Sequence, residues 1–321
     1  MTARTAATEP EVLPQQRWQQ LQRIYQDQVD RLCAGHRDRA RRGEPHPVED
    51  FLFSYYTFRP AQLRRWHPGV GTVLAGEQAR ARLRWPHYTL IDRGDGDPVV
   101  GLDVAGFLAR RGPAVQRIRH LLAATAERPA LLGCFGLHEW AMAYRLPAEG
   151  TRHPAWPLRL GPAGTDTVVE AHRIRCTHHD AFRFFTPAAR PHNAVQPTRE
   201  DQVALEQPGC LHATMDLYKW AYKLAPAVPG ELLLDCFRLA RDVRVMDMRA
   251  SPYDLRALGH EPVPIETAEG KAAYVEAQRD FILRARPLRS RLLEVCEALL
   301  AGPDPEGEPV QRRGSRWRSR P

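Results

Sequence analysis

Helical periodicity over long stretches is the sequence feature that most constrains the fold of this chain. From Gln15 to about Arg42, apolar side chains such as Trp18, Leu21 and Tyr25 recur at intervals of three and four residues. That spacing places them on one face of a long amphipathic helix. Later helices are predicted at residues 216–224, 230–251 and 271–301, the last of them preceded by a capping signal at Thr267. The chain is therefore predicted to be mainly α with a few short strands (α+β).

The remaining segments predict shorter elements. Residues 80–91 indicate a strand or an extended segment, and the apolar run 130–144 predicts a buried helix. Residues 101–127 predict a helix that is broken at Gly112-Pro113, because proline lacks the N–H that an inner helical position donates. Residues 151–169 predict a loop and a short strand, since the side chains from Val168 onward alternate as in an extended segment.

A single mostly helical domain is predicted for residues 15–301. Residues 1–14 are polar and aperiodic, and residues 302–321 form a basic tail of Pro, Gly and Arg. Both ends are expected to be disordered, because they contain too little apolar surface to offset the entropy of ordering.

Composition excludes several classes of protein. No apolar run approaches the roughly 20 residues of a membrane span, and the amino terminus has no apolar signal region. A cytoplasmic protein with no membrane partner is therefore expected. The six scattered cysteines are then thiols or metal ligands, with no disulfide scaffold. The chain has no Walker loop, no GxGxxG motif after a strand and no nucleophile elbow.

Net charge points weakly to an anionic partner. The formal charge is +8, and Arg greatly outnumbers Lys. A basic surface attracts polyanions, because each neutralised phosphate releases counterions. DNA is therefore a candidate partner, while the oligomeric state stays open.

Two similar motifs suggest a metal site. Residues 170–186 and 206–223 each contain Cys-x-His, then an Asp, then aromatic residues. Cysteine and histidine are the usual ligands of zinc, so zinc or another divalent metal could be held by Cys176, His178, Cys210 and His212, with His138 as a further candidate. In the alternative interpretation, the cysteines are buried thiols and the histidines bind backbone carbonyls in an aromatic core.

Three other features have both a structural and a functional interpretation. Glu139 lies in an apolar segment, where a carboxylate is an acid, a base, a ligand or the partner of an arginine. Residues 239–255 interleave Asp242 and Asp247 with arginines, which predicts a solvated, salt-bridged face, with phosphate contact by the arginines as the functional alternative. The aromatic residues of 49–69 either stack on bases beside the nearby arginines or belong to the core.

Several motifs resemble an actinobacterial family commonly labelled 3-methyladenine DNA glycosylase. The resemblance covers about residues 45–295 and rests on "FGLHEWAMAYR", "WPLRLGPAGTDTVVE", "CTHHDAFRFFTP", "EQPGCLHATMDLYKWAYKL" and "RVMDMRASPYDL". The label implies a DNA-binding hydrolase of DNA repair, which removes alkylation damage by cleaving the N-glycosidic bond of purines. No helix-hairpin-helix followed by a Gly/Pro-rich loop and an Asp is visible in the sequence.

Glycosylase chemistry would need a carboxylate beside a stacking pocket. Asp216, Asp180 or Glu139 would stabilise the oxocarbenium-like sugar or orient water. Asp216 is favoured, because it follows His212 by four residues on one helical face. Stacking and phosphate contacts would come from Trp220, Tyr218, Phe182, Phe185, Trp140, Trp66 and Arg183.

Two alternatives to the glycosylase stay open. In the first, the protein is a metal-dependent enzyme that acts on a small molecule through the His, Cys and Asp residues between 138 and 216. In the second, it binds nucleic acid without catalysis. Metal analysis distinguishes the first, and release of free base from methylated DNA distinguishes the glycosylase.

Truncation at Gly302 should leave the melting temperature nearly unchanged, because the basic tail offers almost no apolar surface to bury. Differential scanning calorimetry of the full chain and the truncated chain measures this. A loss of several degrees would show that the tail docks on the domain.

Overall fold

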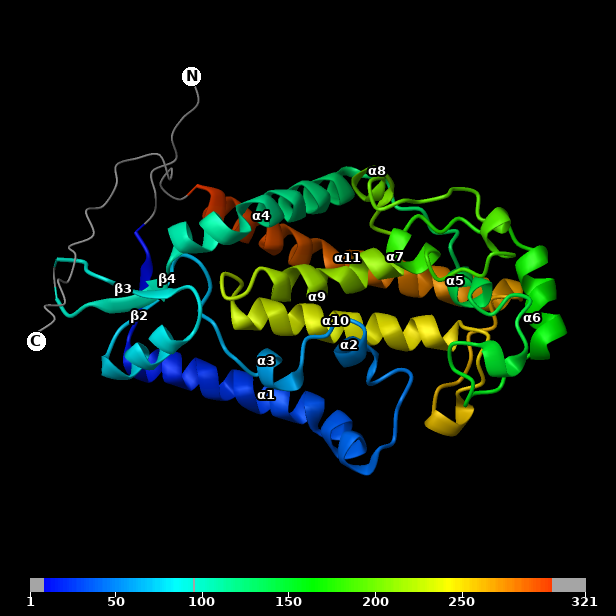
Figure 1. Cartoon of the computed structure of the whole chain (residues 1–321), viewed down its shortest axis with the longest axis horizontal. Coiled ribbons are helices and arrows are strands. Elements are labelled where there is room, and N and C mark those ends of the chain that lie inside the picture. The colour runs from blue at the N-terminus through cyan, green and yellow to red at the C-terminus, as the bar shows by residue number, and fades with distance from the viewer. Residues whose placement is uncertain (1–8, 95, 302–321) are drawn as a thin grey trace, which may run out of the picture.

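Five helices lie side by side along the length of the molecule (Figure 1). The computed structural model describes residues 9–94 and 96–301. The five are α1 (Gln15–Arg42), α4 (Val104–Glu127), α9 (Leu211–Lys223), α10 (Gly230–Arg249) and α11 (Ala268–Leu300). Helix α9 packs against α10 and α11, and α4 packs against α11. The predicted mainly α class with a few strands is confirmed.

Helix α9 lies at the centre of this bundle. Ten consecutive or nearly consecutive residues of α9 are buried, from Leu211 to Ala221. A helix that is buried nearly all round must place its polar side chains against partners inside the protein. His212 and Asp216 are such side chains, and together with the half-buried Lys219 they organise the site described below.

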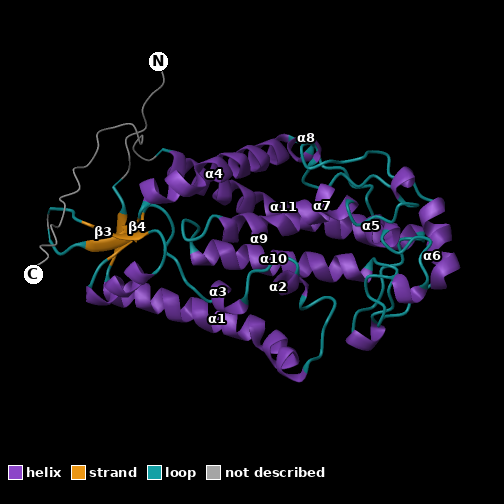
Figure 2. Ribbon diagram, in the orientation of Figure 1, coloured by secondary structure: helices purple, strands orange, loops and turns teal. Residues whose placement is uncertain are grey.

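A small sheet lies at one end of the bundle (Figure 2). Its strands are β1 (Glu11–Leu13), β2 (Thr72–Leu74), β3 (Tyr88–Ile91) and β4 (Val99–Leu102), in the order β1-β2-β4-β3. Strand β1 is parallel to β2, and β4 is antiparallel to β2 and β3. The predicted disorder of residues 1–14 is therefore wrong for Glu11–Leu13, which gains the backbone hydrogen bonds of β2.

Short helices and loops close the other end and flank the bundle. The short α-helices are α2 (Phe51–Ser54), α3 (Pro60–Leu63), α5 (Leu137–Ala141), α6 (Gly161–Glu170), α7 (His179–Phe182) and α8 (Gln202–Leu205). The described part of the chain also contains the 3-10 helices η1 (Glu77–Arg84), η2 (Ala148–Gly150), η3 (Arg190–His192) and η4 (Arg256–Leu258). Chain segments far apart in sequence therefore meet where α5 and α7 contact the central helices.

Two local secondary-structure predictions were wrong, one in a segment that contains threonines and the other at a proline. The segment predicted as loop and strand contains α6, in which the hydroxyls of Thr165 and Thr167 donate to carbonyls four residues back. Helix α4 continues through Pro113, because the buried side chains that follow it, such as Ile118 and Leu122, fix both halves against the core.

Further predictions from the sequence can be compared with the structure. The cap of α11 is confirmed, since the Thr267 hydroxyl accepts a hydrogen bond from the Gly270 amide at 3.0 Å. The buried helix predicted at 130–144 is shorter and comprises only α5. No described helix combines the length and the apolar character needed to cross a membrane. The predicted disorder of residues 1–8 and 302–321 lies outside the described residues.

Candidate metal centre

Three potential metal ligands from three helices meet in the core. They are His138 of α5, His212 of α9 and Asp247 of α10. One ligand atom of each lies within 4.8 Å of those of the other two, and all three residues are buried. Within residues 9–94 and 96–301, this is the one group of His, Cys, Asp or Glu that meets this condition. Two imidazoles and a carboxylate are a donor set used for zinc and non-haem iron. This buried group could therefore bind a metal.

The possible ligand atoms of these three residues lie close to one another. His138 Nε2 lies 3.0 Å from Asp247 Oδ1, and the rings of His138 and His212 are nearly perpendicular with centroids 4.5 Å apart. Neither ring nitrogen of His138, nor Oδ1 of Asp247, makes a hydrogen bond of normal geometry with any described residue. The His138 imidazole and the Asp247 carboxylate nevertheless form a close buried ion pair, so a metal bound here would take the place of the proton between them.

Buried charges set the protonation of this group. Burial would lower the pKa of His138, but the nearby Asp247 carboxylate outweighs burial and raises the pKa well above its usual value. Burial would raise the pKa of Asp247, but attraction to His138 lowers it instead. Burial and the neighbouring His138 both lower the pKa of His212. His212 is therefore a neutral imidazole, the form that binds metals, whereas His138 carries a proton that a metal would have to displace.

A tight turn brings α5 to the end of α10. Phe135 and Gly136, just before α5, have φ angles of 49° and 68°, a conformation that glycine adopts without strain. A side chain at Gly136 would also lie 3.4 Å from Ala250 and Tyr274. Trp140 fixes the helix by donating its Nε1–H to the Ala250 carbonyl at 2.8 Å. His138 is thus held over Asp247 by local backbone geometry.

A second polar group lies beside the first. His178 Nε2 is 3.4 Å from Asp216 Oδ2 and 3.9 Å from Glu206 Oε2. Asp216 also accepts hydrogen bonds from the Tyr56 hydroxyl at 3.0 Å and from Lys219 Nζ at 2.9 Å. The His178 and His212 rings stack with centroids 5.2 Å apart. The two Cys-x-His motifs therefore converge through their histidines, as the sequence predicted.

Lys219 keeps the Asp216 and Asp180 carboxylates charged. Burial would raise the pKa of Asp216, but Lys219 and His178 outweigh burial and hold the pKa far below its usual value. Lys219 also donates to Asp180 Oδ2 at 2.9 Å. Burial opposes the charge of Lys219, but Asp216 and Asp180 raise its pKa. Glu206 is different, because its burial raises the pKa of its carboxyl.

Arg244 neutralises two carboxylates on the other side of the candidate metal centre. Its Nη1 lies 2.9 Å from Glu139 Oε1 and 3.0 Å from Asp247 Oδ2, and its guanidinium stacks on Phe51 at 3.9 Å. The prediction of a solvated face for residues 239–255 is therefore wrong at Arg244 and Asp247, which are 1% and 0% exposed. The tertiary contacts of α10 with α2 and α5 bury this face.

Cys176 and Cys210, which the zinc motif predicted as metal ligands, do not belong to this group of potential ligands. Cys176 and Cys210 are buried, and burial raises the pKa of both thiols. The Sγ of Cys176 lies 3.7 Å from the His178 carbonyl oxygen, to which the thiol donates. Neither cysteine belongs to the three-ligand group, so the geometry corresponds to the alternative of buried thiols.

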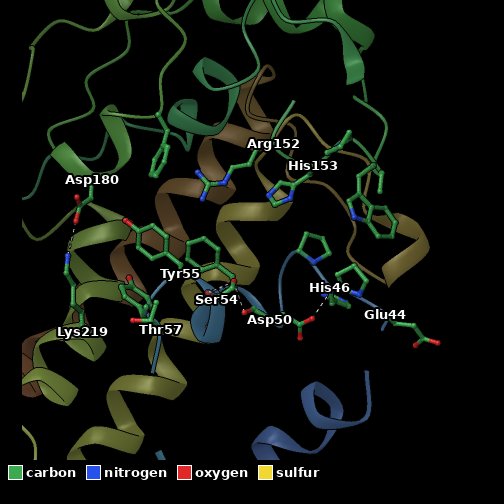
Figure 3. Close-up of a pocket in the computed structure, with 18 of the residues that line it drawn as sticks. Glu44, His46, Asp50, Ser54, Tyr55, Thr57, Arg152, His153, Asp180 and Lys219 are labelled. Atoms are coloured by element: carbon green, nitrogen blue, oxygen red, sulfur yellow. Dashed lines mark hydrogen bonds and ion pairs between the residues drawn. The ribbon is translucent and has the colours of Figure 1, made fainter. Parts of the chain in front are cut away.

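A cavity of about 1200 Å³ adjoins the second polar group. Figure 3 shows its residues, with Asp180 and Lys219 joined by a hydrogen bond on one side and Arg152 and His153 on the other. Tyr55, Tyr56, Trp156 and Phe184 give it aromatic walls, and Arg152, Arg183, Lys219 and Lys223 give it positive charge. A cavity of about 630 Å³ shares Asp180, Arg183, Lys219 and Lys223 with it. Lys219 thus contacts both cavities and the buried Asp216.

The structure places the predicted stacking residues mostly in the core. Trp220 and Arg183 line the smaller cavity. The others are buried, and are Tyr218, Phe182, Phe185, Trp140 and Trp66. Trp66, for example, donates its Nε1–H to Glu231 at 2.8 Å. A candidate stacking surface comes instead from Tyr55, Trp156 and Phe184.

The three carboxylates predicted as catalytic differ in their accessibility. Asp180 lines both cavities, Asp216 is 1% exposed beneath Tyr56 and Lys219, and Glu139 is bound by Arg244. Sequence reasoning missed Asp247 and Glu206 as members of the site. The apolar residues around Asp247 were a usable signal, whereas nothing local distinguishes Glu206 from a surface glutamate.

Comparisons with known proteins add no assignment. Neither models of protein families, nor curated proteins, nor solved structures contain a match to this chain. The function must therefore be inferred from the geometry of the site itself.

Replacing Arg244 with Met should lower the free energy of unfolding by about 3–5 kcal/mol, because the buried Glu139 and Asp247 carboxylates would lose their cation. The matched control is Arg241→Met on the same helix, where the partly exposed pair with Glu49 should contribute no more than about 1 kcal/mol. Urea denaturation measures both. Equal losses in the two variants would contradict the neutralising role of Arg244.

Proposed function

We propose that the protein is a metal-dependent enzyme that acts on a small molecule bound in the cavity of about 1200 Å³. The observation that carries this proposal is the convergence of His138, His212 and Asp247 in the core. Three protein ligands leave coordination positions open, which distinguishes catalytic from closed structural sites. A bound divalent metal would supply a Lewis acid there.

The protein's own residues prepare this site in two ways. Arg244 holds the second oxygen of Asp247, so that the first oxygen stays directed at His138. Such outer contacts orient ligands and tune their basicity. Burial excludes water, which strengthens each electrostatic contact within the site.

The side chains that line the cavity favour an anionic substrate that carries a planar group. Arg152 and Arg183 both stack on Phe184, with guanidinium carbons 4.4 and 4.5 Å from the ring centroid. Of these two arginines, Arg183 faces Asp180 at 3.6 Å. Guanidinium groups bind carboxylate and phosphate in a planar, two-pronged geometry. Aromatic walls beside them would hold a flat, partly apolar group.

Purified protein should contain a divalent transition metal, and His138→Ala, His212→Ala and Asp247→Asn should each lose about one metal ion per chain, because each removes one of three ligands. Inductively coupled plasma mass spectrometry after dialysis, with added zinc or iron, measures the content. The control is His120→Ala on the exposed face of α4, which should keep the metal.

The outcome that would contradict the metal-dependent enzyme is equally definite. If the unmodified protein retains no zinc, iron or manganese after reconstitution, the proposal fails. If the three variants retain the same metal content as the control, the metal is bound elsewhere and the proposed ligands are wrong.

A DNA glycosylase is the second candidate, supported by one observation. The Asp180 carboxylate lines the cavity together with the aromatic side chains of Tyr55 and Phe184, and Figure 3 shows it beside Tyr55. A cationic alkylated base would stack there, and a carboxylate beside the sugar would stabilise its developing positive charge. The sequence favoured Asp216 for this role. Because Asp216 is buried and Asp180 lines the cavity, we now favour Asp180.

If the protein excises alkylated purines, Asp180→Asn should reduce release of free base from methylated DNA by at least about 100-fold while methylated DNA still binds. Chromatography of released base measures turnover. Asp242→Asn, a surface carboxylate paired with Arg284, is the control. The absence of any released base with the unmodified protein would exclude this candidate.

A further inference from the structure

We propose that a separate cavity, between the end of α4 and the middle of α11, binds a small organic anion through Arg289, Arg286 and Arg128. This cavity has a volume of about 500 Å³ and shares no lining residue with the cavities of about 1200 and 630 Å³. The site therefore lies outside the proposed substrate site and does not depend on the proposed function. It is carried by the charge of the lining, by the burial of Arg289 and by the apolar walls.

Helix α11 supplies much of the lining of this cavity. Its contributing side chains lie at intervals of three and four residues, and are Ile282, Arg286, Arg289 and Leu293. That spacing places them on one face of the helix. Arg128, directly after α4, and Pro208, before α9, also line the cavity. Three segments far apart in the sequence therefore meet around it.

The charged side chains that line this cavity are all positive. Among the described residues, its lining contains three arginines and no aspartate or glutamate. Arg128 Nη1 donates a hydrogen bond to the backbone carbonyl of Glu206 at 2.8 Å. A carbonyl is a neutral acceptor, so this contact holds the Arg128 guanidinium in place and leaves its charge uncompensated.

Arg289 is the most deeply buried of the three arginines, since it is only 3% exposed. Its Nε and Nη2 atoms make no hydrogen bond with any described residue. Burial lowers the pKa of Arg289, and attraction to Glu206 opposes this effect only in part. A buried cation is costly unless an anion compensates its charge. This position therefore requires a counter-charge.

Glu206 does not supply that counter-charge. Within the described part of the chain, no carboxylate forms an ion pair with Arg289 within 4.0 Å, and Glu206 Oε2 lies instead 3.9 Å from His178 Nε2. Glu206 also accepts a hydrogen bond from the Gln202 amide at 3.0 Å. Burial raises the pKa of Glu206, which favours its neutral form. An anionic ligand in the adjoining cavity would compensate Arg289 instead.

The lining also indicates the kind of anion. Guanidinium groups bind carboxylate and phosphate through paired, charge-assisted hydrogen bonds. Ile282, Leu293 and Pro208 give the cavity apolar walls, which favour an apolar group over water. A volume of about 500 Å³ falls within the usual range for sites of small molecules. The cavity therefore fits a carboxylate or phosphate joined to a small apolar body.

Isothermal titration calorimetry of the full chain with hexanoate tests this site. Hexanoate should bind, and the neutral hexanamide should bind at least about tenfold more weakly, because it brings no charge to Arg289. Arg289→Met and Arg286→Met should each weaken hexanoate binding at least about tenfold. Arg286→Met changes an exposed residue and carries the test if Arg289→Met fails to fold. Hexyl phosphate in place of hexanoate distinguishes a phosphate ligand from a carboxylate.

The matched control is Arg152→Met, which changes an arginine of the cavity of about 1200 Å³ and should leave this binding unchanged. Hydrogen–deuterium exchange with hexanoate should be slower in residues 282–293. The proposal would be overturned if neither hexanoate nor hexyl phosphate binds, or if hexanamide binds as tightly as hexanoate. Unchanged affinity in both Arg289→Met and Arg286→Met, or loss of binding in Arg152→Met alone, would also overturn it.

Discussion

The need to neutralise charge inside a helical bundle governs the interior of this protein. Asp247 is fully buried between His138 and Arg244, and Asp216 is buried between Tyr56, His178 and Lys219. A single unpaired charge in such surroundings costs several kcal/mol, a large part of the roughly 5–15 kcal/mol by which a domain is stable. The helices that supply these partners must therefore meet in one arrangement.

Helix α9 supplies most of the buried polar side chains that need such partners. One part of its surface packs Tyr218 and Leu217 into the core, and another presents His212, Asp216 and Lys219 to α5, α7 and the loop before α9. Short helices α5 and α7 have little stability of their own. Trp140 fixes α5 through the Ala250 carbonyl, and Lys219 fixes α7 through Asp180. The polar side chains thus position the elements that bring the remaining donors.

The same contacts connect the interior to solvent. Lys219 and Tyr56 contact Asp216 on one side and line the cavity on the other. His153 lines this cavity near Glu139, and burial lowers the pKa of His153 to about 4, so it is neutral at physiological pH. A ligand in the cavity would therefore contact the neutral His153 and the cations Arg152 and Lys219, while the candidate metal centre lies deeper in the core.

The sequence alone determined the long helices, because their apolar spacing is local and repeats over many turns. It also determined the cap at Thr267, since a cap depends on a short local motif. The two Cys-x-His motifs marked His178 and His212 as candidates, but packing of α7 against α9 brought their rings together. Only the tertiary structure decided that Asp247 joins His138 and His212, because a salt-bridged surface helix and a buried one share the same charge pattern until α2 and α5 cover it. Likewise, burial of Asp216 and exposure of Asp180 to the cavity follow from how α7 and α9 pack, and no local sequence pattern encodes that packing.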